Sequence, residues 1–146
     1  MGGQTYGFIV GGSATRFLPG RQGGIPLNNI VNNIFFHVEK IDGLYPCRNF
    51  TERVIRAWEA EIIALWLQKY GDEVRLLETL VELPRSGECY HRAGWQEVGL
   101  TKGFTCKRVA GKGSDSWTGR RVWDVKNLRP KRVFTKRIDS GAQWPG

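Results

Sequence analysis

Short runs of apolar and β-branched residues predict four strands in this chain. The clearest run is 74–83, which is too short for a free-standing helix and is ended by Pro84. Residues 34–40 alternate with a period of two, so His37 and Glu39 are expected on one face of a strand. Two further strands are expected at 5–10 and 95–103.

A long helix is predicted for residues 49–70. Asn49 and Glu52 have the spacing of a capping box, and Gly71 is a typical residue for a helix end. Apolar side chains recur along this segment at helical spacing, which predicts a face that packs in the core. These side chains are Val54, Trp58, Ile62, Leu65 and Trp66.

A second, short helix is predicted between the strands at 74–83 and 95–103. Ser86 is expected to cap its start, and Gly94 is expected to end it in the left-handed conformation. Cys89 and Tyr90 then fall on one helical face with Ala93. We interpret Cys89 as a small core residue rather than a nucleophile.

The glycine-rich segment 11–24 is expected to be a flexible loop. It lacks the Lys-Ser/Thr ending of a P-loop, which argues against nucleotide binding of that kind. Four asparagines follow it, and we expect their amides to satisfy turn backbone, with a role at the edge of a substrate site as the alternative for one of them. They are Asn28, Asn29, Asn32 and Asn33.

The composition predicts one cytoplasmic domain. A chain of 146 residues can bury a single core, and its three cysteines are odd in number and widely spaced, as in a reducing compartment. No apolar run has the length of a membrane span, and no secretory signal is recognised. Two histidines with scattered cysteines give no metal-ligand spacing, so no metal site is expected.

Positive charge is concentrated in residues 101–137. The whole chain carries a net charge of +8, whereas this stretch holds twelve basic residues and two acids, a net charge of +10. Such asymmetry predicts a polyanionic partner, DNA above all, and the interleaved aromatics favour this over the alternative of a solvated tail. The expected contact residues are Lys107, Arg108, Lys112, Trp117, Arg120, Arg121, Arg129, Lys131 and Arg132.

The order of strand, short tyrosine-bearing helix, Gly-aromatic and strand resembles the C-terminal half of the GNAT acyltransferase fold. The motif reads Tyr90, three residues, Gly94, Trp95. The longer string LLETLVE…SGECYHRAGWQEVGLTKG resembles the Mom-type DNA-modification proteins of phages and the DruA-type proteins of Druantia anti-phage systems. The resemblance covers residues 29–103, which we take as the core of a single domain, with 104–146 as a basic extension.

This resemblance implies a fold, a donor site and a catalytic acid. The fold would be α/β: a mixed, mostly antiparallel GNAT-like sheet flanked by helices, in which the strand at 34–40 diverges from that at 74–83 and the donor enters between them. Tyr90 would protonate the leaving group as general acid. Trp95 and Trp117 are candidates for stacking on an acceptor base.

The donor is unknown from the sequence. In GNAT enzymes a glycine-rich loop before the long helix binds the donor pyrophosphate, and that position holds Cys47, Arg48 and Asn49 here. The usual R/Q-x-x-G-x-G/A signature is absent. Ordinary acetyl-CoA is therefore expected to bind poorly. An acyl-CoA or a related donor is the candidate that the resemblance implies.

The candidates for a general base are the acids and the histidine of the two central strands. Glu78 and Glu82 lie four residues apart on one strand, so they share a face. Either one serves as base with a raised pKa, or the two pair with Arg92 or Lys102. His37 with Glu39 is the other candidate, against the alternative of a histidine at a solvated sheet edge.

Three functions fit these features. The first is a GNAT-type transferase that adds a small acyl-type group to an exocyclic amine of phage DNA, adenine by the Mom resemblance, on a flipped or single-stranded base. The second is a non-catalytic DNA-binding protein of defence or anti-defence. The third and weaker is a conventional acyl-CoA-dependent N-acetyltransferase.

Overall fold

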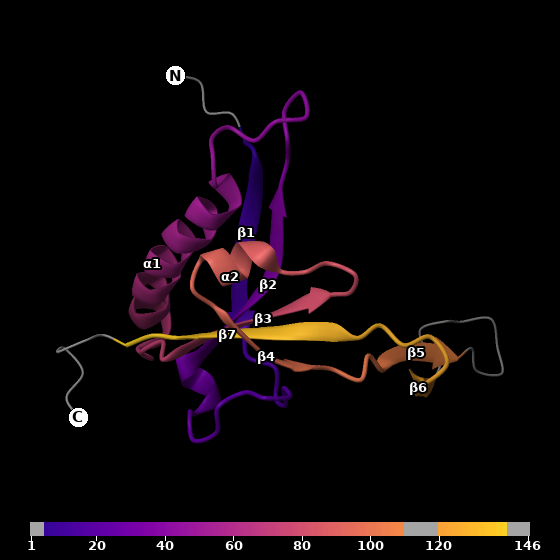
Figure 1. Ribbon diagram of the computed structural model, residues 1–146. Coiled ribbons are helices and arrows are strands. Elements are labelled where there is room, and N and C mark those ends of the chain that lie inside the picture. Colours follow the sequence, from indigo (N-terminus) through magenta and orange to yellow (C-terminus); the bar gives the residue numbers. More distant parts are fainter. Residues whose placement is uncertain (1–4, 110–119, 140–146) are drawn as a thin grey trace.

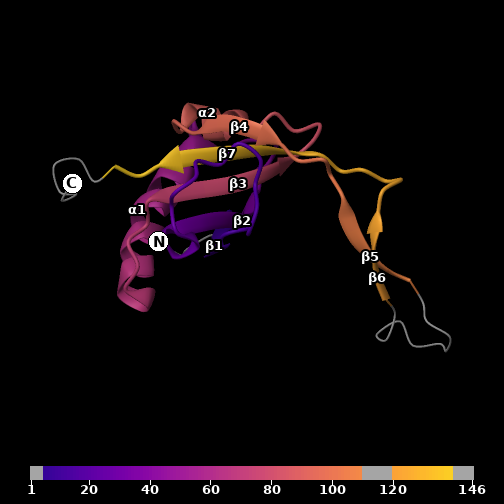
Figure 2. The ribbon, with the colours of Figure 1, turned by 90° about the horizontal axis from the view of Figure 1, so that it is seen from below.

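A five-stranded sheet with two helices on one face forms the body of the protein, and a separate two-stranded hairpin extends from it (Figure 1, Figure 2). The structure is a computed structural model that describes residues 5–109 and 120–139. The α/β class expected from the sequence is confirmed. The elements are β1 (Gly7–Ser13), the 3-10 turn η1 (Leu27–Asn29), β2 (Ile30–Val38), α1 (Phe50–Tyr70), β3 (Leu76–Glu82), α2 (Glu88–Arg92), β4 (Gln96–Leu100), β5 (Thr105–Val109), β6 (Arg120–Asp124) and β7 (Lys131–Arg137).

The strand order of the main sheet is β1-β2-β3-β7-β4. Only β2 and β3 are parallel among the described strands, and the other neighbours are antiparallel, so the sheet is mixed and mostly antiparallel as expected. β7 was expected in a basic extension, yet it lies between β3 and β4. Val133 and Phe134 are fully buried there. The core therefore reaches beyond residue 103, and the solvated-tail alternative is wrong for this strand.

Helix α1 has nearly the predicted bounds but starts differently. Gly71 ends it in the left-handed conformation, and its amide donates to the Leu67 carbonyl one turn back, at 2.8 Å. The predicted capping box is wrong, because Asn49 is itself left-handed at φ 57° and its side chain caps nothing. Glu52 instead accepts a hydrogen bond from Arg56 at 3.3 Å.

The buried face of α1 is rotated slightly from the predicted one. Trp58 is buried, and Ile62 and Trp66 pack partly buried against the core, as expected. Leu65 is 52% exposed, whereas Ile55, which the prediction missed, is fully buried. The stripe that faces the sheet therefore runs through Ile55, Trp58 and Ile62 with the spacing of consecutive turns.

Strand β2 begins four residues earlier than predicted. Asn32 and Asn33 were expected in a turn, but they lie within the strand and are buried. Opposite them, the register with β1 shifts between Val10 and Gly11, which leaves Ile34 as the extra residue of a bulge. Ile34 is accordingly 59% exposed.

The glycine-rich segment is held against the sheet rather than hanging free. Its first residues belong to β1, and the rest crosses the face opposite α2 (Figure 1, Figure 2). The Thr15 amide and the Arg21 guanidinium donate to the Glu78 carboxylate at 3.0 and 2.9 Å. Further along, the loop backbone touches β4: a Cβ on Gly99 would stand 2.5 Å from the Pro19 carbonyl oxygen.

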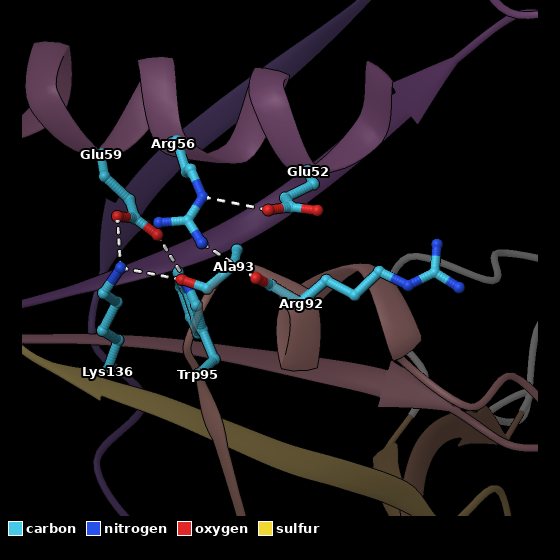
Figure 3. Close-up of polar contacts among 7 residues, drawn as sticks. All are labelled: Glu52, Arg56, Glu59, Arg92, Ala93, Trp95 and Lys136. Carbon is cyan, nitrogen blue, oxygen red and sulfur yellow. Dashed lines mark hydrogen bonds and ion pairs between the residues drawn. The ribbon is translucent and has the colours of Figure 1, made fainter. Parts of the chain in front are cut away.

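On the helical face, a buried polar cluster ties α1 to β4 and β7 (Figure 3). The Glu59 carboxylate accepts hydrogen bonds from Trp95 Nε1 at 2.6 Å and from Lys136 Nζ at 2.8 Å. Lys136 also donates to the Ala93 carbonyl at 2.9 Å. Arg56 donates to the carbonyl at the end of α2. These bonds fix the helices over the sheet.

Lys136→Met should lower the free energy of unfolding by about 3 kcal/mol, because the buried Glu59 carboxylate loses its counter-ion. Urea unfolding measures this. Arg92→Met is the matched control: its ion pair with Glu88 is more than half exposed, so a loss below about 1 kcal/mol is expected. Equal losses in the two variants would contradict the anchoring role of Lys136.

Candidate functional site

The candidate site is a cleft between the two parallel strands. β2 and β3 pair only where Ile30–Asn33 lies beside Leu76–Thr79, and beyond these residues the strands diverge (Figure 1). A cleft of about 770 Å³ occupies the space. It is lined by residues 33–37 of β2, 79–82 of β3, 85–90 of the following turn and α2, and Lys131 of β7. Its volume is within the range of small-molecule sites.

Asn33 and Tyr90 meet at the inner end of this cleft. The Tyr90 hydroxyl donates to Asn33 Oδ1 at 2.5 Å. Asn33 Nδ2 donates to the carbonyls of Val10 and Phe35, both at 3.0 Å. The Thr79 hydroxyl donates to the Asn33 carbonyl at 3.0 Å. The asparagine thus joins β1, β2, β3 and α2 at the point where the strands part.

Tyr90 is held in an aromatic environment. Its ring lies 5.1 Å from that of Trp95, 5.8 Å from Phe134 and 6.3 Å from Phe36, centre to centre. Burial raises the pKa of Tyr90 to about 12, and a hydrogen bond with the Thr79 side chain opposes this only in part. The hydroxyl keeps its proton at neutral pH and donates it to Asn33 in a hydrogen bond, and its role as a general acid stays a prediction.

Cys89 lies beside Tyr90 and also lines the cleft. Burial raises the pKa of its thiol, so the sulfur stays protonated at neutral pH and is a weak nucleophile. The side chain packs partly buried against the core. This agrees with the interpretation of Cys89 as a small core residue.

The two strand glutamates have separate environments. Glu78 is fully buried, does not line the cleft and is neutralised by Arg21. Glu82 does line the cleft, with its nearest basic partner Arg129 at 3.9 Å. The expected partners, Arg92 and Lys102, are wrong for both. Glu78 is thus an anchor of the glycine-rich loop, and Glu82 is the strand acid that a ligand in the cleft could reach.

His37 and Glu39 lie on the outer face of β2 and beyond its end. His37 lines the cleft, and its Nε2 lies 3.4 Å from Glu39 Oε1. Both side chains are more than half exposed. Glu39 is outside the cleft lining, so His37 is the member of this pair that is placed for chemistry.

The three residues expected to bind a donor lie away from the cleft lining. Cys47, Arg48 and Asn49 are all exposed in the segment before α1. The Cys47 sulfur accepts a hydrogen bond from Arg53 at 3.9 Å. The left-handed Asn49 is the N-cap residue of α1. A donor that reaches both places must therefore extend from the cleft to this helix end.

The expected nucleic-acid contacts fall into three groups. Lys131 lines the cleft, and Arg129 lies near Glu82. Arg132 is engaged with Glu97 at 2.9 Å, which lowers its availability to a ligand. Lys107 and Arg108 occupy β5, Arg120 and Arg121 occupy β6, and the register pairs Arg108 with Arg121. Lys112 and Trp117 lie outside the described residues.

Trp95 does not fit the role of a base-stacking residue. Its side chain is only 2% exposed and its indole N–H is bonded to Glu59. The sequence placed it just before a strand, where it packs under α1. Stacking on this residue is therefore excluded by its burial.

Sequence reasoning missed Thr79 and undervalued Asn33. Both are buried polar residues inside apolar strands, where a side chain needs a hydrogen-bonding partner. That signal was present in the run IVNNIFF, in which two asparagines interrupt an apolar strand. What the signal could not show is the partner, because Tyr90 is 57 residues away along the chain.

Comparison with protein-family models, with curated proteins and with solved structures finds no match to this chain. Within residues 5–109 and 120–139, no helix has the length and apolar character needed to cross a membrane. No cluster of three or more His, Cys, Asp or Glu side chains that could hold a metal occurs among the described residues.

The raised pKa of Tyr90 predicts a loss of stability in alkali. Between pH 10 and about pH 12 the unfolded tyrosine has lost its proton while the folded one retains it, so the free energy of unfolding falls as pH rises. The difference from the ordinary pKa corresponds to about 2–3 kcal/mol. Urea unfolding of the protein and of Tyr90→Phe across this range measures it. Parallel pH curves for the two proteins would contradict the prediction.

Proposed function

We propose that this protein is a GNAT-type transferase that moves a small acyl-type group from a donor in the cleft to an exocyclic amine of a DNA base. The observation that carries the proposal is the position of the Tyr90 hydroxyl at the inner end of a cleft between two diverging parallel strands. It supplies a hydrogen-bond donor in a largely water-excluded place, where such a group is effective.

The strand arrangement supports the same proposal. The GNAT resemblance predicts a tyrosine on the short helix after the central strand and a donor site where that strand diverges from its neighbour. In agreement with this expectation, β2 and β3 are parallel neighbours that diverge, and α2, which follows β3, carries Tyr90. The cleft lies between β2 and β3, which supports a donor site there.

The cleft supplies candidates for each proton transfer. The amine nitrogen attacks the acyl carbon of a thioester donor, a new C–N bond forms and the C–S bond breaks. Glu82 or His37, which both line the cleft, takes the proton that the amine releases. Tyr90 turns from Asn33 to the departing sulfur, gives its proton as charge develops there, and regains one from solvent. The donor is an acyl-CoA or a related thioester.

Two observations favour a second candidate, a non-catalytic DNA-binding protein of defence or anti-defence. The Tyr90 hydroxyl is already bonded to Asn33, and Cys47, Arg48 and Asn49 lie outside the cleft lining. The second point also weakens the conventional acyl-CoA-dependent N-acetyltransferase. Both alternatives are distinguished from the proposal by the products found on DNA.

Tyr90→Phe should lower the yield of modified base about 10²- to 10⁴-fold, because only the proton donor is removed. Plasmid DNA from bacteria expressing the protein is digested to nucleosides and analysed by mass spectrometry. Tyr70→Phe, which changes an exposed tyrosine at the end of α1, is the control and should modify normally.

Two outcomes would overturn the assignment. A folded Tyr90→Phe protein with the yield of the parent would show that the hydroxyl has no catalytic role. Unmodified plasmid in the presence of the parent protein, together with tight DNA binding, would favour the non-catalytic candidate.

Lys131→Ala should weaken binding of all DNA sequences and reduce the slope of log K against log salt by up to about one, since each phosphate contact releases a counterion. Arg137→Ala is the matched control at the other end of β7, where Arg137 pairs with Asp139 at 3.2 Å. Fluorescence titrations at several salt concentrations measure the slopes. The same slope change in both variants would mean that general charge, and not the cleft end of β7, binds the backbone.

A further inference from the structure

The outer face of β1 and β2 carries an exposed aromatic pair. The rings of Phe8 and Phe35 are stacked, with centres 4.9 Å apart and planes 9° from parallel. Their side chains are exposed to 55% and 48%. Val10 stands opposite Phe35 in the register and is also exposed. We call Phe8, Val10 and Phe35 the aromatic shelf.

The aromatic shelf faces away from α1. Ile9 and Phe36, the neighbours of its aromatic residues along the chain, pack against the core under the helix, and successive residues of a strand point to opposite faces. Two large aromatic side chains side by side on an open sheet face are costly unless something covers them, and such patches mark binding sites.

The shelf is continuous with the cleft. Phe35 and His37 both line it on the β2 side. Tyr90 lines the same cleft from α2, on the helical face of the sheet. The opening between the diverging strands therefore connects the outer face, where Phe35 lies, with the tyrosine hydroxyl.

The opposite wall of the cleft carries two basic and two acidic residues, and Lys131 stands opposite Glu82 in the register of β3 with β7. Arg85 and Lys131 line it, and no ion pair joins either of them to a carboxylate within the described part of the chain. The two acids of the lining already have basic neighbours: Glu82 has Arg129 at 3.9 Å and Glu88 has Arg92 at 3.6 Å. This wall suits a phosphate.

From these features we infer a nucleotide subsite, in which a base stacks on Phe35 of the aromatic shelf and its phosphate meets Arg85 and Lys131. The inference rests on the proposed function, because it names the place where the acceptor base would bind. A base taken out of a duplex or already single-stranded has a free aromatic face for such stacking. The His37 imidazole then stands at the edge of the shelf, within the same cleft.

A nucleotide fits the shelf better than a second copy of the chain. Stable protein interfaces bury about 800 Å² on each partner and involve about 20 or more residues a side. The shelf has three side chains, and the cleft beside it is concave and has Arg85 and Lys131 in its lining. A planar ring joined to a phosphate satisfies both walls at once.

The test uses the full-length Tyr90→Phe protein, so that binding is measured without turnover. Its probe is a single-stranded oligodeoxynucleotide with one 2-aminopurine, whose fluorescence is quenched by stacking. Adding Phe35→Leu should remove the quenching and weaken binding about 5- to 150-fold, as expected for the loss of one stacked base. Adding Tyr70→Leu, which removes an equally exposed aromatic from α1, should change neither.

A second pair of measurements separates the sources of phosphate. Adding Lys131→Ala should weaken oligonucleotide binding while the quenching of the bound form persists, and calorimetric binding of coenzyme A should be unchanged. If Lys131→Ala weakens coenzyme A and leaves the oligonucleotide unaffected, the cations belong to the donor and the inference is wrong.

Other outcomes decide between the subsite and its alternatives. Unchanged quenching in Phe35→Leu overturns the subsite, and a shift of the parent's oligomeric state by that substitution would show that the shelf joins two copies. Quenching by a protein that leaves plasmid DNA unmodified would support the subsite and contradict the transferase. Full modification of plasmid DNA by the Phe35→Leu protein would contradict the subsite and support the transferase.

Discussion

The hydrogen bonds of Asn33 fix the place where β2 and β3 diverge, and the position of the cleft and of Tyr90 depends on them. Two parallel strands that diverge leave backbone and side-chain groups without ladder partners, and in a buried place such groups must be satisfied. Asn33 provides such partners where the strands part. Its side-chain N–H donates to carbonyls on both sides of the bulge at Ile34. Its main-chain carbonyl accepts from the Thr79 hydroxyl, and its side-chain oxygen accepts from the Tyr90 hydroxyl. The cleft, the bulge and the place of the tyrosine are thus one arrangement.

Two ion-pair clusters keep the sheet in shape on either side of this fork. Arg21 on Glu78 holds the glycine-rich loop to one face, and Lys136 on Glu59 holds α1 to the other. Both carboxylates are buried and each is paired with a basic side chain, so their role is structural. Chemistry is left to polar groups that line the cleft, of which Tyr90, Glu82 and His37 are the titratable ones in our proposal.

Local pattern predicted most elements, because helix and strand periodicity depend on neighbouring residues. It found α1, β3, α2 and the left-handed Gly94, whose φ is +89°. The predicted Ser86 cap of α2 is wrong, because the N-cap residue is the left-handed Gly87, which makes no side-chain cap. Local pattern did not predict that β7 lies between β3 and β4, because KRVFTKR reads as a basic tail until its pairing with distant strands is known. For the site, Tyr90 was predicted, whereas the role of Glu78 depends on Arg21, 57 residues earlier.

The most direct test of the cleft as the ligand site is a crystal structure of the protein bound to a short single-stranded oligodeoxynucleotide that contains adenine. Our account predicts one base between β2 and β3, with its ring against Phe35 and its exocyclic amine directed toward the end of the cleft where Tyr90 lies. DNA bound along the β5–β6 hairpin alone, with the cleft between β2 and β3 empty, would contradict it.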